Sequence, residues 1–394
     1  MTEWIFWASA AVVVYTYAGY PVILALLAKW APGPPIQRGP ARLRASIVVV
    51  AHDEALHIER KILDCLEQRY PPELLEVLVA SDGSRDRTEE IVEGYATKGV
   101  RLFRLTGPRG KPAALNHVVP LAKGDVIVLT DARQRLDPEA VSALVENFAD
   151  PSVGAVSGEL HIQGSSDSVT GGGVGAYWRL EKWMRRLEAR LDSTVGATGA
   201  LYAIRRELFR ALPEEIILDD VAIPMAVART GHRVVFESRA RAFDTAATVS
   251  GEFRRKVRTL AGNLQLVWVE PWLLNPWKNR LWWPLVSHKL ARLAVPWALG
   301  LLLAATFVLG VWVAPPRTLY LGAFVGQVCF YCAGLVGWLL ERRGTRWRLP
   351  SFAAAFCLLN AAALVALLQF LLGRSRVTWK NGGSPVGDRG PREP

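Results

Sequence analysis

The chain has 394 residues, a formal net charge of +11 and a hydrophobic fraction of 51%. Its length exceeds the usual size of one domain, and its long apolar runs exclude an ordinary water-soluble protein. The cations flank those runs, as they do in membrane proteins, so we expect membrane lipids rather than a nucleic acid as the anionic partner. Nothing in the sequence identifies a protein partner.

Four runs contain no Asp, Glu, Lys or Arg: 4–28, 293–316, 318–340 and 349–373. Each has about 23 to 25 residues, and about 20 residues suffice for a helix to cross a bilayer. The first run is longer than the core of a signal peptide and follows Glu3 instead of a basic region, which favours a retained helix. The sequence therefore predicts a membrane helix in 1–30, a water-soluble domain in 42–260 and about three membrane helices in 293–373.

Basic residues predict the orientation of these helices. The segments 38–44 and 342–348 are rich in arginine, and cytoplasmic loops carry such an excess. We therefore expect a multi-pass protein of the cell membrane with a cytoplasmic soluble domain. Four simple crossings place the basic segment 374–380 outside, so either this tail breaks the rule or one span is re-entrant. The remaining tail, 381–394, has no apolar face and is predicted to be disordered.

Strands and helices alternate in the first half of the soluble domain. Strands are predicted at 46–51, 76–81, 100–105 and 125–131, with helices at about 54–69, 86–96 and 111–122 between them. The first strand is continuous and β-branched, as a parallel strand buried on both faces is. This order predicts βαβ units and a doubly wound α/β sheet, whose ligands bind beyond the carboxyl ends of the strands.

Acidic side chains follow three of these strands. Glu54 comes shortly after the first strand, Asp82 follows the second, and Asp131 ends the fourth. Each alone has an ordinary explanation as a helix cap or a turn residue. Together, at one edge of a sheet, they predict a binding site.

The second half of the domain adds a glycine loop, an acidic pair and a basic run. A strand-like segment at 155–160 and a helix at about 174–191 precede a glycine loop and short strand within 196–209. Asp219 and Asp220 then stand at the start of a helix, where acids also stabilise the helix dipole without any further function. Segment 253–263 carries four cations within six residues, just before the membrane.

Six short segments, taken in order, resemble the motifs of the inverting family 2 glycosyltransferases, in particular their membrane-anchored, polysaccharide-synthase-like branch. They are VVVAHDEA (48–55), VASDGSRDRT (79–88), GPRGKPAALNH (107–117), TDAR (130–133), LDDVAIP (218–224) and RRKVRT (254–259). The likeness covers about residues 10–300. The departures from the family pattern are Asp53 for Asn, Ser81 and Arg133 for Asp, Arg255 for Gln and Thr259 for Trp.

The resemblance implies a GT-A type, Rossmann-like catalytic domain. It transfers a sugar from a nucleotide-diphosphate sugar, expected to be a UDP-sugar, to a hydroxyl of a glycan or lipid-linked acceptor, with Asp220 as the general base. Donor contacts are expected from Ala51, His52, Glu54, Asp82, Lys111, Asp131, Arg133, Arg255 and Arg258. Acceptor contacts are expected from Asp219, Thr198 and Gly199. The loop 52–54 and Asp82 are expected to hold the uridine, with a carboxylate that accepts a hydrogen bond from the uracil N–H.

Arg133 stands where the family's Asp-x-Asp motif has its second carboxylate. A divalent ion at a diphosphate needs only one or two protein carboxylates, so Asp131 alone suffices for one Mg²⁺ or Mn²⁺. Arg133 would then contact phosphate directly. The alternative is a metal-independent site in which Lys111, Arg133, Arg255 and Arg258 neutralise the diphosphate.

The departures also leave the product open. Thr259 lacks the aromatic face that the family's tryptophan offers to an acceptor sugar, so transfer of a single sugar to a lipid carrier competes with polymer synthesis. Segment 261–292 mixes tryptophans with cations, which predicts an amphipathic helix on the membrane surface. Two other classes remain: a transporter with a nucleotide-binding domain, and a scaffold that binds nucleotide without catalysis.

Overall fold

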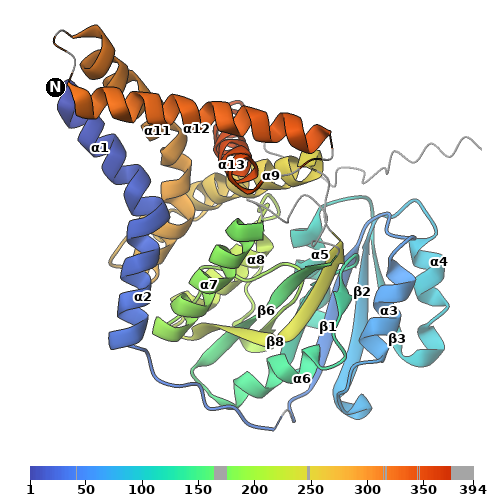
Figure 1. The fold of residues 1–394 in the computed structure, drawn as a ribbon. Helices are drawn as coiled ribbons and strands as arrows, with labels where there is room; N and C mark the ends of the chain where they lie inside the picture. Colours follow the sequence, from blue (N-terminus) through green and yellow to red (C-terminus); the bar gives the residue numbers. More distant parts are fainter. Residues whose placement is uncertain are drawn as a thin grey trace, which may run out of the picture.

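The computed structural model describes residues 1–40, 42–163, 175–245, 249–313, 315, 317–343, 345 and 347–373. In these residues, eight strands form one sheet in the order β3-β2-β1-β4-β7-β6-β8-β5. Figure 1 shows the sheet with helices on both faces, below a layer of long helices that contains the N-terminus. The tail segments 374–380 and 381–394 lie outside the described residues.

The first four strands are parallel and match the predicted ones closely. They are β1 (Ala45–Ala51), β2 (Leu75–Asp82), β3 (Val100–Leu105) and β4 (Val126–Asp131). Every residue of β1 is buried, because helices cover both of its faces. α3 (Ile58–Leu66) and α6 (Ala140–Val145) pack on one face, and α5 (Lys111–Val118) and α8 (Asp219–Arg229) pack on the other. The carboxyl ends of β1, β2 and β4 open at one edge.

The second half of the sheet is mixed, unlike the doubly wound sheet expected from the sequence. β7 (Tyr202–Arg205) runs antiparallel to β4 and to β6 (Val153–Gln163), while β8 (Arg233–Thr245) is parallel to β6 and antiparallel to β5 (Arg135–Leu136). β7 begins opposite Leu129, near the carboxyl end of β4. The chain enters the sheet from that edge and therefore runs back antiparallel, since a parallel strand would need a crossover to the opposite edge.

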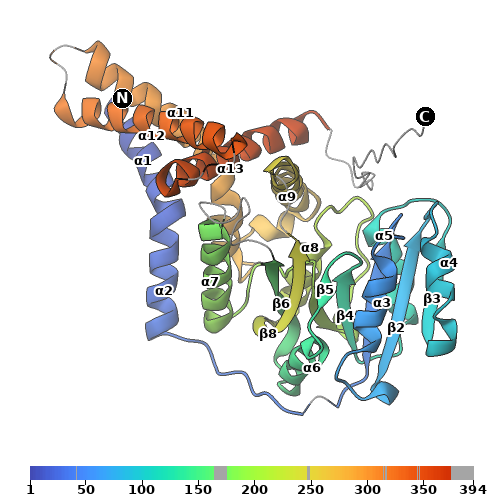
Figure 2. The same ribbon diagram turned by 45° about the vertical axis from the view of Figure 1, so that its right-hand side comes forward.

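Four helices in the described residues are long and apolar enough to cross a membrane: Thr2–Trp30, Trp282–Trp312, Thr318–Arg342 and Arg348–Leu371. The first contains α1 (Thr2–Val14) and α2 (Tyr20–Trp30), and the second contains α10 (Trp282–Pro284) and α11 (Ala291–Phe307). The last two are α12 and α13. All four overlap the charge-free runs, and the second begins before its run and includes Lys289 and Arg292. Figure 2 shows α12 and α13 running across the top of the molecule, whereas α1 descends toward the sheet domain.

Two helices join the membrane layer to the sheet domain. α7 (Gly175–Leu191) packs against Tyr20 and Leu24 of α2. α9 (Val249–Val269) packs against α13 and against the loop before α8, where a side chain at Gly262 would collide with Leu218. Segment 261–292 is not one amphipathic helix as expected. Because Pro271 and Pro276 interrupt it, α9 ends at Val269 and the next long helix begins at Trp282.

Candidate active site

The loops that follow β1 and β2 are hydrogen-bonded to each other. His52 Nδ1 lies 2.7 Å from the carbonyl oxygen of Asp82, and the Arg85 N–H donates to Asp53 Oδ1 over 2.7 Å. The Ala55 N–H donates to Asp86 Oδ2 over 2.9 Å. Asp53 adopts the left-handed backbone conformation, with φ of 54°, which aspartate tolerates better than most residues. Because residues 52–55 make these loop contacts, α3 begins at Ile58, later than the predicted start near residue 54.

Asp82 is fully buried and organises a third loop. Its Oδ1 accepts a hydrogen bond from the Arg109 N–H over 2.9 Å, and its Oδ2 accepts one from the Gly110 N–H over 2.7 Å. The loop lies so close that a side chain at Gly83 would come within 2.6 Å of the Gly107 carbonyl carbon. Asp82 therefore orients the start of α5. Its expected contact with a uracil base stays a prediction.

Lys111, the first residue of α5, joins two of the predicted site residues. Its Nζ lies 2.8 Å from Asp131 Oδ1 and 3.0 Å from Asp219 Oδ2. Burial alone would lower the pKa of Lys111, but the two carboxylates outweigh it and raise that pKa. Lys111 is therefore a permanent cation at the centre of the site.

Asp220 faces the same space as Asp131. The Gly199 N–H donates to Asp220 Oδ2 over 3.1 Å. A side-chain carbon on Gly199 would lie 3.2 Å from this oxygen and 3.7 Å from Asp131 Oδ2. Burial, and then the neighbouring charge of Asp219, raise the pKa of Asp220 to about 6. Asp219 itself accepts a hydrogen bond from Tyr202 over 3.2 Å, so the two adjacent aspartates have different surroundings.

Glu54 and Arg133 lie at the donor edge of this site. Burial raises the pKa of Glu54; the nearby charge of Arg133 opposes this effect, and that of Asp131 adds to it. Arg133 is half exposed and pairs with Asp244 at 3.1 Å. The structure therefore brings Glu54, Asp131 and Arg133 within electrostatic range of one another.

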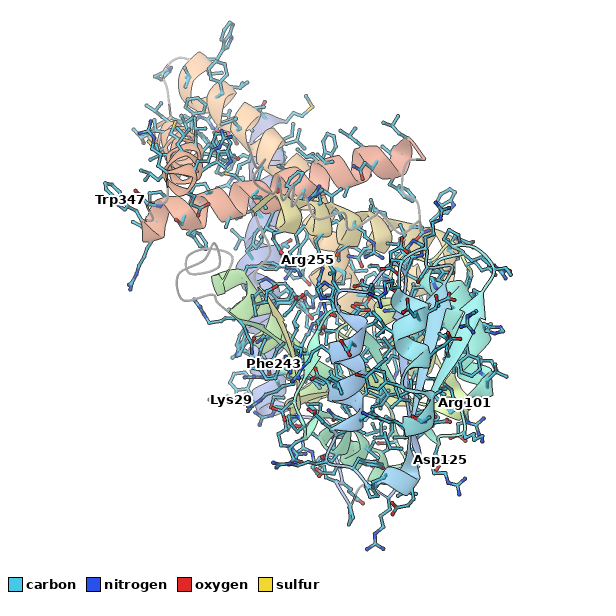
Figure 3. The ribbon with its side chains drawn as sticks, turned by 90° about the vertical axis from the view of Figure 1, so that its right-hand side faces the viewer. Lys29, Arg101, Asp125, Phe243, Arg255 and Trp347 are labelled. Carbon is cyan, nitrogen blue, oxygen red and sulfur yellow. The ribbon has the colours of Figure 1, made fainter. Side chains whose placement is uncertain are left out.

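The other predicted residues are more distant or serve as framework. Ala51 is buried at the end of β1, and the Thr198 N–H donates to Ser157 Oγ over 3.1 Å. Figure 3 shows Arg255 above the sheet on α9, where it pairs with Glu252. Arg258 is exposed. Within the described residues, neither arginine pairs with a carboxylate of the site, so their contacts with phosphate stay predictions.

Sequence reasoning missed a buried lysine behind Asp131. Lys61 of α3 is 1% exposed, and its Nζ donates to Thr130 Oγ1 over 3.1 Å. Burial lowers the pKa of Lys61. Its helical spacing with Ile58 and Cys65 places it on the apolar face of α3, and this was the signal available in the sequence.

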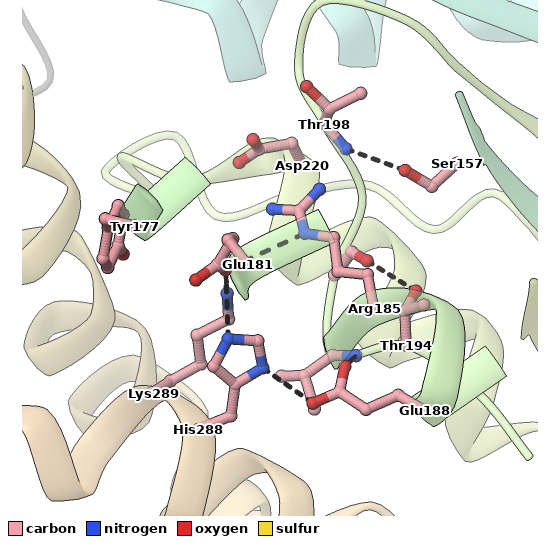
Figure 4. Close-up of polar contacts among 12 residues, drawn as sticks. Ser157, Tyr177, Glu181, Arg185, Glu188, Thr194, Thr198, Asp220, His288 and Lys289 are labelled. Carbon is pink, nitrogen blue, oxygen red and sulfur yellow. Dashed lines mark hydrogen bonds and ion pairs between the residues drawn. The ribbon is translucent and has the colours of Figure 1, made fainter. Parts of the chain in front are cut away.

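A network of ion pairs, also missed, connects α7 to the helix Trp282–Trp312 (Figure 4). His288 lies 3.0 Å from Glu181 and 2.7 Å from Glu188. Lys289 and Arg292 approach Glu181 to 3.0 and 2.8 Å. We call Glu181, Glu188, His288, Lys289 and Arg292 the α7 network. No sequence signal reveals it, because its members are about a hundred residues apart.

The protein residues at this site can bind one divalent ion only if phosphate oxygens of the sugar donor and water complete its coordination. No cluster of three or more His, Cys, Asp or Glu side chains suited to a metal occurs in the part of the chain that the structure describes. Asp131 is 41% exposed in its side chain and offers one carboxylate. Hard cations that keep water and bind substrate phosphates often take only one or two protein ligands.

A larger hollow, of about 420 Å³, lies between α8, the end of α9 and the loop 210–216. Its lining includes Leu212, Met225, Leu266 and Trp272, and none of the predicted site residues. The predicted site therefore lies at the polar carboxyl edge of the parallel strands and not in this hollow.

The family model for glycosyl transferase family 2 matches residues 46–212. The probable glycosyltransferase YdaM of Bacillus subtilis (strain 168) is 26% identical over 243 residues, which cover 57% of this chain and 56% of the relative. Poly-beta-1,6-N-acetyl-D-glucosamine synthase of Staphylococcus aureus (strain COL) is 24% identical over 228 residues, which cover 56% and 55%. The chain thus spans about half the length of these curated relatives.

Among solved structures, the fold resembles the mannosyltransferase PcManGT from Pyrobaculum calidifontis in complex with GDP-Man and Mn²⁺. The TM-score is 0.71 with 22% identity, over 95% of this chain and 100% of that one. This likeness confirms the predicted GT-A type fold.

Proposed function

We propose that this chain, whose residues 46–212 are a glycosyl transferase family 2 domain, is a membrane-bound inverting enzyme that uses a nucleotide-diphosphate sugar, with a UDP-sugar as the expected donor. The supporting observation is that Asp131 and Asp220 both face Gly199, and that Lys111 pairs with Asp131, at the carboxyl edge of the parallel strands. This edge is where open α/β sheets bind their ligands.

Asp220 is the proposed general base. The acceptor oxygen attacks the anomeric carbon while the bond from that carbon to the diphosphate breaks, and the bonding electron pair leaves with the nucleoside diphosphate. Asp220 takes the proton from the acceptor hydroxyl. A pKa of about 6 keeps this carboxylate ionised at neutral pH and makes it a stronger base than an exposed aspartate. One such displacement inverts the anomeric configuration.

The departing diphosphate needs positive charge. Lys111 supplies a fixed cation in the site, and Arg133 supplies one at the donor edge. One Mg²⁺ or Mn²⁺ held by Asp131 would add Lewis-acid charge at the phosphates. In the competing metal-independent form, Arg255 and Arg258 would neutralise the diphosphate together with Lys111 and Arg133.

The acceptor is proposed to be a hydroxyl of a glycan or a lipid-linked molecule. The four apolar helices and the tryptophans before the second long helix support a membrane location. The arginine-rich segments 38–44 and 342–348 support a cytoplasmic catalytic domain. Thr259 is exposed on α9, so this position presents no aromatic ring to a growing polymer. Single transfer and polymer synthesis therefore both remain within the proposal.

The test is to incubate detergent-purified full-length protein with a panel of nucleotide sugars and to detect released nucleoside diphosphate. We expect release with one class of donor. Mass analysis of the product then separates a polymer from a single added sugar. If a donor binds but none is cleaved, the protein is a nucleotide-binding transporter or scaffold instead, and if no donor binds, the proposed function fails.

A further inference from the structure

A small pocket lies beside the loop that carries Gly199. Its lining includes Glu159, Trp178, Glu181, Lys182, Arg185 and Thr198. Thr198 connects this pocket to the site, because the next residue, Gly199, donates a hydrogen bond to Asp220. An acceptor whose hydroxyl reaches Asp220 would therefore have its neighbouring groups in or near the pocket.

Arg185 is the pocket residue that points toward Asp220. Figure 4 shows its guanidinium between Asp220 and Glu181. The side chain is 18% exposed and lies 3.8 Å from Glu181, a long ion pair. Its Nε is buried and, within the described residues, has no hydrogen-bond partner. This N–H is an unused donor for a ligand.

The two carboxylates of the pocket are already neutralised by other cations. Glu181 contacts the cations of Lys289 and Arg292 at 3.0 and 2.8 Å, and the imidazole of His288 at 3.0 Å. Glu159 contacts Lys182 at 2.9 Å and Arg186 at 2.8 Å. The charge of Arg185 is therefore left for Asp220 or for a bound molecule.

We propose that this pocket binds an anionic group of the acceptor, and that Arg185 is its ligand. The inference rests on the proposed function. The acceptor class is a hydroxyl compound with a phosphate or carboxylate close to the reacting hydroxyl. The reason is charge balance: when Asp220 takes the acceptor proton it becomes neutral, and Arg185 then lacks a counter-charge unless the acceptor supplies one.

A second cation beside the pocket supports this assignment. Lys256 of α9 lies 4.6 Å from the centre of the Trp178 ring and 3.7 Å from Glu252 Oε1. Burial lowers the pKa of Lys256 to about 8, which shows that its charge is incompletely compensated. An anion held by Arg185 next to Trp178 would stabilise both cations.

The acceptor's charge can be tested with material from the source cells. Lipid and aqueous extracts are each passed over an anion-exchange column, and every fraction is offered to the wild-type enzyme with the radiolabelled donor found in the panel. We expect incorporation into the column-bound fraction. Label in the lipid extract identifies a headgroup, and label in the aqueous extract identifies a soluble acceptor. Incorporation confined to the unbound, neutral fraction overturns the proposal.

A matched pair of variants tests the role of Arg185 itself. Arg185→Gln should raise the KM for the anionic acceptor by about ten- to a hundredfold, the usual effect of losing a charge-assisted hydrogen bond. Arg185→Lys should recover part of this loss. Arg179→Gln removes the same charge from an exposed position of α7 and should change nothing. An unchanged KM in Arg185→Gln rules out the assignment.

A pH profile excludes a merely structural role. Asp220 is surrounded by Asp219, Asp131, Lys111 and Arg185, and Arg185 lowers its pKa. Arg185→Gln should therefore move the acid limb of kcat to higher pH, whereas Arg179→Gln should not. If wild-type enzyme binds no donor and labels no fraction, the proposed function fails. If it labels the neutral fraction, only the anionic acceptor fails.

Discussion

The proposed donor side and the proposed acceptor side of the site are held by contacts of different range along the chain. On the donor side, the loops after β1 and β2 are held by hydrogen bonds between residues 30 to 32 positions apart. On the acceptor side, α7 is held by residues of the helix Trp282–Trp312 that are 100 or more positions away. The proposed donor pocket is therefore a property of the sheet domain, whereas the proposed acceptor pocket depends on how the apolar helix Trp282–Trp312 packs against α7.

This difference predicts that donor binding and transfer to the acceptor can be separated by mutation. Donor binding should survive changes that loosen the α7 network, because Asp82 and Lys111 are anchored within the sheet domain. Transfer to an acceptor should be lost, because Glu181 and Arg185 lie on the helix that the network positions.

The largest effect is expected from Asp220→Asn. Removal of the base should lower kcat by about 10²- to 10⁴-fold while the Kd for the donor stays within about twofold. Asp219→Asn is the informative neighbour, because Asp219 is tied to Tyr202 and Lys111. Nucleoside diphosphate release and calorimetric donor binding measure the two quantities. A normal kcat in Asp220→Asn would show that Asp220 is not the base, and the role would then be assigned to Asp219.

The next largest effect is expected on stability, when the α7 network is broken. Glu188 is 2% exposed, accepts a hydrogen bond from Tyr20 over 2.7 Å and pairs with His288. Glu188→Ala should cost about 3 to 5 kcal/mol, because it removes a buried carboxylate that both His288 Nδ1 and the Tyr20 hydroxyl contact. Thermal unfolding in detergent measures the loss.

The control for this variant is Glu139→Ala. Glu139 pairs with Arg69 at 2.8 Å, but both side chains are more than half exposed. Such surface pairs contribute about 1 kcal/mol or less. Equal losses in the two variants would show that the α7 network has no special part in docking. Donor binding by Glu188→Ala below its melting temperature should equal that of the wild type.

Chelation tests the donor side. With only Asp131 to hold an ion, EDTA should lower turnover by about a hundredfold or more, and Mn²⁺ or Mg²⁺ should restore it. Asp131→Asn should lose this metal response. Full activity in EDTA would favour the competing form, in which Lys111 and Arg133 neutralise the diphosphate.

The same contrast explains what could be predicted from the sequence. Glu54, Asp82 and Asp131 follow strands with a clear hydrophobic pattern, so their shared edge was foreseeable. The ion pair between Arg133 and Asp244 could not be foreseen, because these residues are 111 positions apart and lie across the mixed part of the sheet. Arg185 looked like one more charge on an amphipathic helix. Only the docking of His288 and Lys289 onto Glu181 shows that this carboxylate has closer partners than Arg185, which keeps a long ion pair of 3.8 Å.

The smallest predicted effect concerns pH. Asp220 acts as a base only when ionised, and its pKa is raised to about 6 by burial and by Asp219, against the lowering charges of Lys111 and Arg185. The ionised fraction therefore falls as pH drops through 6, and kcat at pH 5 should be about tenfold below its plateau. Kinetics at a saturating donor concentration, between about pH 4.5 and 8, measure this acid limb of the kcat profile. A limb near pH 4, the value of an exposed aspartate, would mean that the base lies in a solvated environment and that the acceptor pocket opens wider than the structure shows.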